Sequence, residues 1–282
     1  MLGLVLEGGA NRTYYTIGIL DALMDNNIKC DMLIGVSAGI ANGISYASSQ
    51  RGRGMELGEK CISDKRYMGM KYYFKKGNGS YYNIDFVFRH VPEKIVPFDY
   101  ESFRNFPGKV YAVVTNVRTG KSEYLPVDDY DKSWKIILAS CALPLMFKPV
   151  EIDGESYMDG GCSDPLPVEF AYKAGCDKVL CVFTREREYH KEGGSEAAIS
   201  SFLFRKNKEF SSVLKNRSNI YNNSRDFIFQ KEKEGSAFIF APKCTEGWKR
   251  TEKRFDYLQK MYNEGYNDAV NRMDELKKFI SE

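Results

Sequence analysis

The sequence has no strong excess of charge of either sign, since 41 basic and 38 acidic residues give its 282 residues a formal net charge of +3. Because these charges are mixed along the chain, composition gives no indication of nucleic-acid binding. The sequence also lacks any segment of 18 uncharged apolar residues, and its start shows no basic, then apolar, secretory signal. We expect a cytoplasmic protein and leave peripheral contact with a membrane open.

The cysteines and histidines show no pattern typical of a disulfide framework or a metal site. The seven cysteines are odd in number and scattered, without a C-x-x-C pair, which argues against both a disulfide framework and a zinc site. We expect reduced, mostly buried thiols and no metal. Only two histidines are present, His90 and His190, so any serine nucleophile has few candidates for the usual imidazole base.

Alternating strand-like and helix-like segments predict an α/β fold. Residues 2–6 are apolar and 13–26 have apolar residues at helical spacing, and residues 32–34 and 38–50 repeat this order. Two hairpins are expected, at 110–127 and 150–158. Residues 179–183 form the continuous apolar run typical of a buried parallel strand, and we expect the core sheet to end there.

The chain changes character after residue 196. It becomes rich in charged residues with helical periodicity, broken only by the β-like residues 237–240, and closes with helix-prone sequence from 252 to 280. We divide it into an α/β domain, 1–196, and a mostly helical C-terminal extension, 197–282. Charged helices are typical of solvated faces, although these could also cover a site or mediate oligomerisation. The oligomeric state is left open.

The pentapeptide Gly35-Val36-Ser37-Ala38-Gly39 matches G-x-S-x-G. In this motif the serine sits on a sharp strand-to-helix turn, where the helix N-terminus and the next backbone N–H can stabilise an oxyanion. The pattern alone is weak, but here it follows an apolar strand and opens a small-residue helix. We favour Ser37 as a nucleophile over a structural Gly-Ser turn.

A base for Ser37 is offered by Asp159-Gly160-Gly161, which follows the strand-like residues 156–158. A carboxylate at a strand end beside flexible backbone could reach Ser37 without an imidazole, although an ordinary turn fits this motif equally well. His190 follows in the chain order of a Ser-Asp-His triad. Its charged neighbours favour a surface position instead.

The loop Gly8-Gly9-Ala10-Asn11-Arg12 lies between the first strand and the first helix. Its backbone N–H groups can converge on a developing negative charge, where such donors are each worth about 3 kcal/mol of transition-state stabilisation. A dinucleotide-binding turn would require glycine at positions 10 and 13, where Ala10 and Thr13 stand. We expect Gly8, Gly9 and Ala10, with Ala38, to form an oxyanion hole.

In chain order, the glycine-rich loop, the G-x-S-x-G turn and the Asp159-Gly160-Gly161 motif resemble those of the patatin-like phospholipase family, in particular its bacterial branch with a helical C-terminal extension. The resemblance covers about residues 2 to 184. It implies a three-layer α/β/α fold with a mainly parallel sheet and a serine hydrolase that cleaves lipid acyl esters without a cofactor. By motif position, the resemblance implies that Ser37 is the nucleophile and Asp159 the base. Five further residues of the motifs would support this site: Arg12, Gly35, Gly39, Gly160 and Gly161.

Two departures from the family pattern keep other functions open. Ala10 and Thr13 stand where the family usually has glycine, which would restrict the oxyanion loop. A soluble carboxylesterase for short acyl esters and a non-catalytic lipid- or protein-binding scaffold on the same fold are the alternatives. Aromatic residues and lysines between Tyr67 and Phe88 suggest a surface that admits a lipid chain, although a helix with one buried face explains them equally well.

Overall fold

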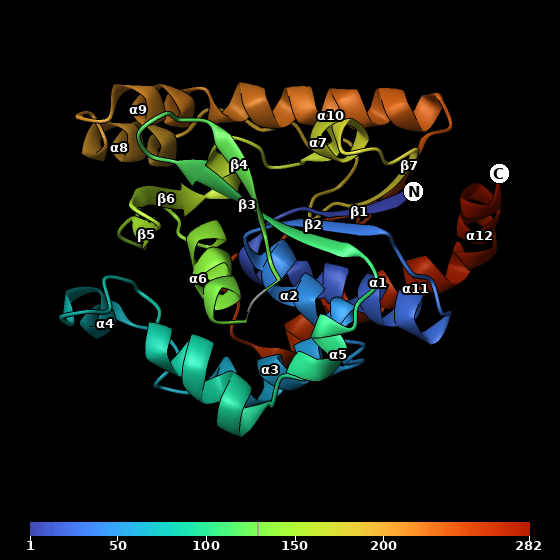
Figure 1. Ribbon diagram of the computed structural model, residues 1–282, viewed down its shortest axis with the longest axis horizontal. Coiled ribbons are helices and arrows are strands. Elements are labelled where there is room, and N and C mark those ends of the chain that lie inside the picture. Colours follow the sequence, from blue (N-terminus) through green and yellow to red (C-terminus); the bar gives the residue numbers. More distant parts are fainter. Residues whose placement is uncertain (129) are drawn as a thin grey trace.

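The computed structural model describes residues 1–128 and 130–282, with the side chains of all of these except 130–133. A single mixed sheet runs through the molecule (Figure 1), with strand order β5-β6-β3-β2-β1-β7-β8 and β4 paired to β3. The strands are β1 (Leu2–Leu6), β2 (Met32–Val36), β3 (Lys109–Asn116), β4 (Ser122–Pro126), β5 (Val150–Ile152), β6 (Glu155–Asp159), β7 (Lys178–Val182) and β8 (Ala237–Phe240).

Helices connect and cover these strands. In chain order they are η1 (Ala10–Thr13), α1 (Tyr14–Asp25), α2 (Ala38–Ala47), α3 (Arg53–Cys61), α4 (Met70–Phe74), η2 (Phe86–Ile95), α5 (Tyr100–Arg104), α6 (Tyr130–Ser140), η3 (Gly160–Cys162), α7 (Val168–Lys173), α8 (Ser195–Leu203), α9 (Lys208–Lys215), α10 (Arg217–Lys233), α11 (Phe255–Asn271) and α12 (Met273–Ser281). The expected β-loop-α units at residues 2–26 and 32–50 and both hairpins are confirmed.

The fold has three layers, as predicted. Side chains alternate across the sheet, so Leu4 and Leu6 of β1 pack in the cluster that includes α1 and α2, whereas Val5 packs in the cluster that includes α7 and α10. Figure 1 shows α7 and α10 on one side of the sheet and α1, α2 and α11 on the other. Strands β3, β2, β1, β7 and β8 run parallel, and both of their faces are covered.

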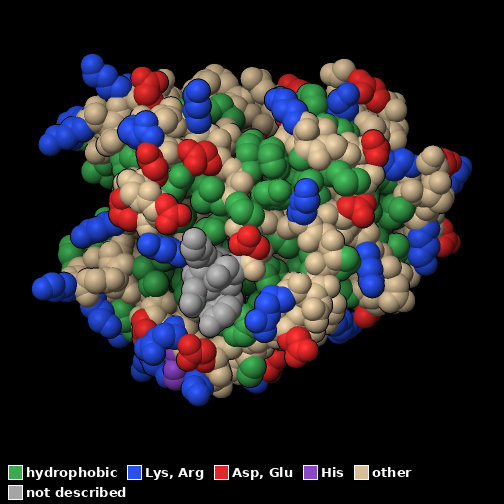
Figure 2. Space-filling view, in the orientation of Figure 1, with side chains coloured by type: hydrophobic (Ala, Val, Ile, Leu, Met, Phe, Trp, Pro, Cys, Tyr) green, Lys and Arg blue, Asp and Glu red, His purple; other side chains and the backbone are tan. Residues whose placement is uncertain are grey.

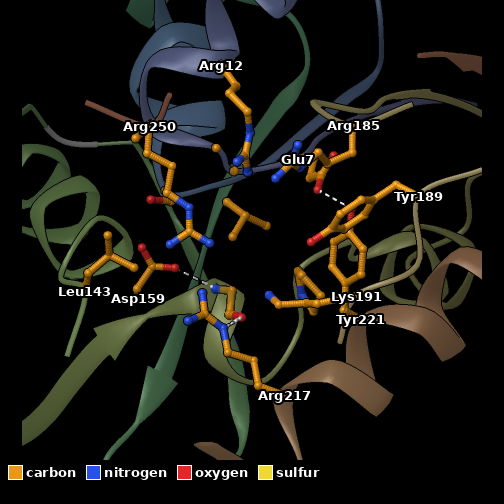
Figure 3. Close-up of a pocket in the computed structure, with 17 residues that line it drawn as sticks. Glu7, Arg12, Leu143, Asp159, Arg185, Tyr189, Lys191, Arg217, Tyr221 and Arg250 are labelled. Carbon is orange, nitrogen blue, oxygen red and sulfur yellow. Dashed lines mark hydrogen bonds between the residues drawn. The ribbon is translucent and has the colours of Figure 1, made fainter. Parts of the chain in front are cut away.

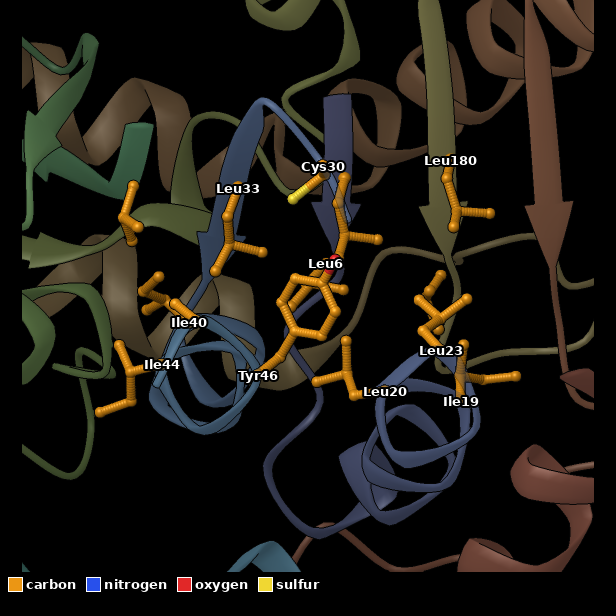
Figure 4. Close-up of a cluster of buried hydrophobic side chains, with 14 of the residues drawn as sticks. Leu6, Ile19, Leu20, Leu23, Cys30, Leu33, Ile40, Ile44, Tyr46 and Leu180 are labelled. Atoms are coloured by element: carbon orange, nitrogen blue, oxygen red, sulfur yellow. The ribbon is translucent and has the colours of Figure 1, made fainter. Parts of the chain in front are cut away.

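The larger core cluster lies between the central strands and the helices α1 and α2 (Figure 4). Leu6 and Leu33 of the sheet meet Ile19 of α1 and Ile40 of α2, and all four side chains are fully buried. Burying a side chain of this size contributes about 1.5–3 kcal/mol to folding. This packing fixes the positions at which β1 and β2 end, and therefore the loops that follow them.

The expectation that the sheet ends at residue 183 is wrong. Strand β8 pairs in parallel with β7, from Val179 opposite Ala237 to Val182 opposite Phe240, and so forms the sheet edge. Its four residues are all buried, which explains their β-like, wholly apolar sequence. The C-terminal residues thus share the sheet of the N-terminal ones, and the proposed domain boundary at residue 196 stays a prediction.

The surface in Figure 2 carries interspersed basic and acidic side chains, as the balanced composition suggests. Within residues 1–128 and 130–282, none of the helices has the length and apolar character needed to cross a membrane. All seven cysteines are free thiols, and five of them are buried. No group of three or more potential metal ligands occurs in the described part of the chain.

Glycine at position 265 allows α11 to lie directly against α1. A Cβ there would collide with the carbonyl oxygen of Tyr15. Replacing glycine by alanine in a helix normally stabilises by up to about 1 kcal/mol, but overpacking costs about 1–3 kcal/mol. We therefore expect Gly265→Ala to lower the urea midpoint of unfolding, and the matched change Gly193→Ala, which meets no atom within 4 Å, to leave it nearly unchanged. A stabilised Gly265→Ala protein would contradict this contact.

Candidate active site

Ser37 occupies the sharp turn between β2 and α2. Its backbone has φ 54° and ψ −128°, in a region that residues other than glycine rarely adopt. The turn is compact because the helix returns close to the strands: a Cβ on Gly35 would lie 2.6 Å from the Ile40 backbone, and one on Gly39 would lie 2.5 Å from the Leu6 carbonyl. Both motif glycines are therefore needed sterically.

A hydrogen bond from a distant helix holds the same turn. The Ser37 backbone N–H donates to the hydroxyl of Ser140 at 2.8 Å, and Ser140 is fully buried at the end of α6. Sequence reasoning did not select Ser140, since a single serine near a helix end carries no signal of a partner 103 residues away. We interpret it as a positioning residue for the nucleophile turn.

Asp159 reaches Ser37 through the pairing of β3. One edge of β3 pairs first with β2, up to Val36 opposite Val113, and then with β6, from Asp159 opposite Val114. The other edge of β3 pairs with β4. The last residue of β6 therefore lies directly beyond the end of β2. The structure thus brings the two predicted catalytic residues together at one point of the sheet.

The Asp159 carboxyl is buried and held in place. Its side chain accepts a hydrogen bond from the Gly161 N–H at 2.8 Å, and its backbone carbonyl accepts one from Thr115. The second carboxyl oxygen, Oδ2, is buried and accepts no hydrogen bond among the described residues. Burial raises the pKa of Asp159, and the positive charge of Arg217 and the hydroxyl of Ser37 act in the opposite direction.

The glycine-rich loop lies next to Ser37. Gly8, Gly9 and Ala10 line a chamber with Ser37 and Asp159. Ala10 has φ 49°, so the residue at the family's glycine position adopts a left-handed backbone. Thr13, the second departure from the family pattern, is buried and donates its hydroxyl to the Ala10 carbonyl at 2.6 Å. It therefore ties the loop in place.

Two chambers meet at Ser37, and Ser37, Ala10 and Leu143 line both. The polar chamber has a volume of about 60 Å³. Figure 3 shows its charged side chains, with Arg12, Arg250, Arg217 and Lys191 around one common space beside Asp159. Its full lining is Glu7, Gly8, Gly9, Ala10, Arg12, Val36, Ser37, Leu143, Asp159, Gly161, Pro165, Arg185, Tyr189, Lys191, Arg217, Tyr221 and Arg250.

The apolar chamber, about 220 Å³ in volume, lies on the other side of Ser37. Ala38 lines it, together with three aromatic residues of the segment that the sequence singled out, Tyr67, Tyr82 and Phe88. Further apolar walls come from Tyr14, Ile44, Leu57, Ile62, Val87, Val91, Trp134, Ile137 and Phe147. Elsewhere in that segment Phe74 is 78% exposed, and peripheral contact with a membrane stays a prediction.

The remaining predicted site residues lie nearby or away from the chambers. Gly160 begins η3 directly after Asp159 and is buried. His190 is exposed, as expected, and its Nε2 lies 3.0 Å from the Asn222 amide. Four basic residues of the polar chamber, Arg185, Lys191, Arg217 and Arg250, were not predicted, because nothing in a charged sequence distinguishes a cation that faces a chamber from one that faces solvent.

Comparison with known proteins identifies the family. The sequence model of the patatin-like phospholipases matches residues 4–172, and a domain of unknown function, DUF6363, matches residues 207–281. Because the first match spans more than half of the chain, the protein belongs to the patatin-like phospholipase family. The resemblance inferred from the three motifs is therefore confirmed.

Individual relatives are distant. The uncharacterized protein YjjU of Escherichia coli is 25% identical over 197 residues, which cover 65% of this chain and 52% of that protein. Lysophospholipase NTE1 of Meyerozyma guilliermondii is 26% identical over 186 residues, 64% of this chain but 12% of that protein. The crystal structure of VipD from Legionella pneumophila matches with TM-score 0.40 and 12% identity, covering 93% of this chain and 66% of that one. The chain thus spans about half the length of YjjU and a small part of the fungal enzyme.

Glycine at position 10 should relieve the left-handed strain of the loop. A left-handed backbone costs an L-residue about 1–2 kcal/mol, and the greater freedom of glycine in the unfolded chain offsets about 0.4–1 kcal/mol of the relief. We expect Ala10→Gly to raise the free energy of unfolding by roughly 0.5 kcal/mol, measured in urea. Ala198→Gly, on the exposed side of α8, should instead lower it by about 0.5–1 kcal/mol. Equal losses in both variants would argue against strain at Ala10.

Proposed function

We propose that this protein hydrolyses acyl esters of lipids, with Ser37 as nucleophile and Asp159 as general base. The observation that carries this proposal is the pairing of β3, which places a buried carboxyl at the end of β6 next to a strained serine at the end of β2. Membership of the patatin-like phospholipases and similarity to proteins named lysophospholipases support a lipid ester as substrate.

The proposed reaction has two steps. Asp159 accepts the hydroxyl proton as the Ser37 oxygen bonds to the ester carbonyl carbon, and backbone N–H groups of the glycine-rich loop and Ala38 hold the resulting oxyanion. The intermediate collapses, the alcohol leaves with the proton from Asp159, and the acyl group stays on Ser37. Water then attacks the acyl-enzyme while Asp159 takes its proton, and Ser37 leaves with that proton as the fatty acid is released.

The two chambers suit such a substrate. With the ester carbonyl at Ser37, an apolar chain can occupy the chamber lined by Tyr67, Tyr82 and Phe88, and the alcohol part can enter the polar chamber. The volume of about 220 Å³ and the apolar lining favour a long acyl chain over a short one. These features support a lipid hydrolase over an esterase for short acyl esters.

Loss of either dyad residue should abolish turnover. We expect Ser37→Ala and Asp159→Asn to lower kcat/KM for a long-chain aryl ester by roughly 10⁴-fold or more, and Ser37→Ala to abolish covalent labelling by a fluorophosphonate. His190→Ala is the matched control and should behave as wild type. Absence of labelling in folded wild-type protein would favour a non-catalytic scaffold, and faster turnover of short-chain than long-chain esters would favour a carboxylesterase.

The acid limb of activity should follow the raised pKa of Asp159. Only the ionised carboxyl can act as base, so kcat/KM should fall as pH decreases through a pKa above the ordinary aspartate value of about 3.9. Arg217 lowers this pKa, so Arg217→Gln should move the limb to higher pH.

The raised pKa of Asp159 also affects folding. Because the native state binds the Asp159 proton more tightly than the unfolded chain does, the free energy of unfolding falls as pH rises through this range.

An uncharged aryl ester is the substrate for these profiles, so that binding of charge does not contribute. Arg205→Gln, at an exposed position in the turn between α8 and α9, should leave the limb where it is in wild type. A limb that stays in place in Arg217→Gln, or activity that is flat down to about pH 4 in wild type, would argue against Asp159 as the base.

A further inference from the structure

The polar chamber collects positive charge beside the nucleophile. Five basic side chains line it, and four of them, Arg185, Lys191, Arg217 and Arg250, lie beyond residue 172, where the match to the patatin-like phospholipases ends. The fifth, Arg12, belongs to the glycine-rich loop. Only two carboxylates share this lining. The chamber is therefore cationic, and mainly through the C-terminal part of the chain.

Neither lining carboxylate forms an ion pair with these cations among the described residues. Both oxygens of Glu7 accept hydrogen bonds, one from the backbone N–H of Thr184 and the other from the hydroxyl of Tyr221 at 2.7 Å. Asp159 is the proposed base. Glu196 pairs with Arg250 at 3.3 Å and with Arg217 at 3.8 Å, but its side chain is about half exposed, and such pairs contribute little.

Two of the cations, Arg12 and Lys191, form no ion pair among the described residues. Arg12 is only 7% exposed, and its Nε is buried without a hydrogen-bond partner among the described residues. Its guanidinium forms no ion pair in this part of the chain, and the same holds for the Lys191 ammonium, which lies 5.0 Å from the centre of the Tyr221 ring. Burial and the nearby Arg217 and Arg250 lower the pKa of Lys191 to about 7. Unpaired cations that are buried, as Arg12 is, or partly buried, as Lys191 is, are costly unless an anion joins them.

The same lining disfavours a headgroup that carries a positive charge. A quaternary ammonium needs a carboxylate or an open aromatic face. The two tyrosines of the chamber are already covered, since the Arg185 guanidinium lies 4.5 Å from the Tyr189 ring centre and Lys191 lies over Tyr221. A compact anion fits these conditions, and a zwitterion does not.

We propose that Arg12, Lys191 and Arg250 bind the terminal phosphate of a singly acylated glycerol phosphate, whose ester lies at Ser37 and whose chain fills the apolar chamber. This substrate class rests on the proposed function. Arginine and lysine are the usual partners of phosphate, and their hydrogen bonds to it are charge-assisted. The C-terminal extension, rather than the family's common core, then selects the headgroup.

Binding of a lipid that cannot be hydrolysed tests this site apart from catalysis. The probe is 1-O-alkylglycerol 3-phosphate, an ether, titrated by calorimetry into the full chain. We expect the double variant Lys191→Met, Arg250→Gln to bind it at least roughly tenfold more weakly than wild type. Lys249→Met, which removes an exposed charge next to Arg250 in sequence, should bind as wild type does, and this control variant and wild type should label equally with fluorophosphonate.

Three outcomes would overturn the proposal. Equal affinity of wild type and the double variant would show that these cations do not hold the phosphate. Equal affinity for the ether and for its headgroup-free counterpart, 1-O-alkylglycerol, would exclude phosphate recognition. Inorganic phosphate that binds as tightly as the ether would identify a site for free phosphate instead of a lipid headgroup. Failure of Ser37 labelling would overturn the proposed hydrolase without changing any of these binding results.

Discussion

One strand edge organises this molecule. The edge of β3 that pairs with β2 up to Val113 pairs with β6 from Val114 onward, so two chain segments more than 100 residues apart end at the same point. Ser37 follows the last residue of β2, and Asp159 is the last residue of β6. A one-residue slip in the register of β6 would turn the Asp159 side chain to the opposite face of the sheet. The fold positions the site through backbone pairing, which is more rigid than side-chain packing alone.

The strained backbone at this point is maintained from several directions. Ser37 and Ala10 both have positive φ angles, which cost free energy that neighbouring contacts must offset. Ser140 accepts from the Ser37 N–H, and Thr13 is linked both to the Ala10 carbonyl and to Asn42 of α2. These bonds connect the two loops that would surround an oxyanion. The family's glycine is thus replaced by a tethered alanine.

Most of the fold and both residues of the proposed dyad could be predicted from local sequence patterns. Residues 2–6 and 32–34, the G-x-S-x-G turn and the Asp159 motif each have their signal within a few neighbours, and the structure places them as elements in the expected order. The partner of residues 237–240 could not be predicted, because a buried apolar strand carries no information about which neighbour it pairs with. Arg217 and Arg250 were missed for a similar reason: their role depends on where distant helices pack.

The two chambers are built from different parts of the sequence. The apolar chamber and the dyad come from residues before 172, within the match to the family. The cations come mainly from residues after it, from Arg217 at the start of α10 and from loops of the C-terminal part, which shares the sheet through β8 and packs on α1 through α11. Since like charges that are gathered and partly buried destabilise the empty fold, such a cluster requires a compensating benefit. In the proposed complex, the phosphate of the substrate offsets that cost when the ester lies at Ser37.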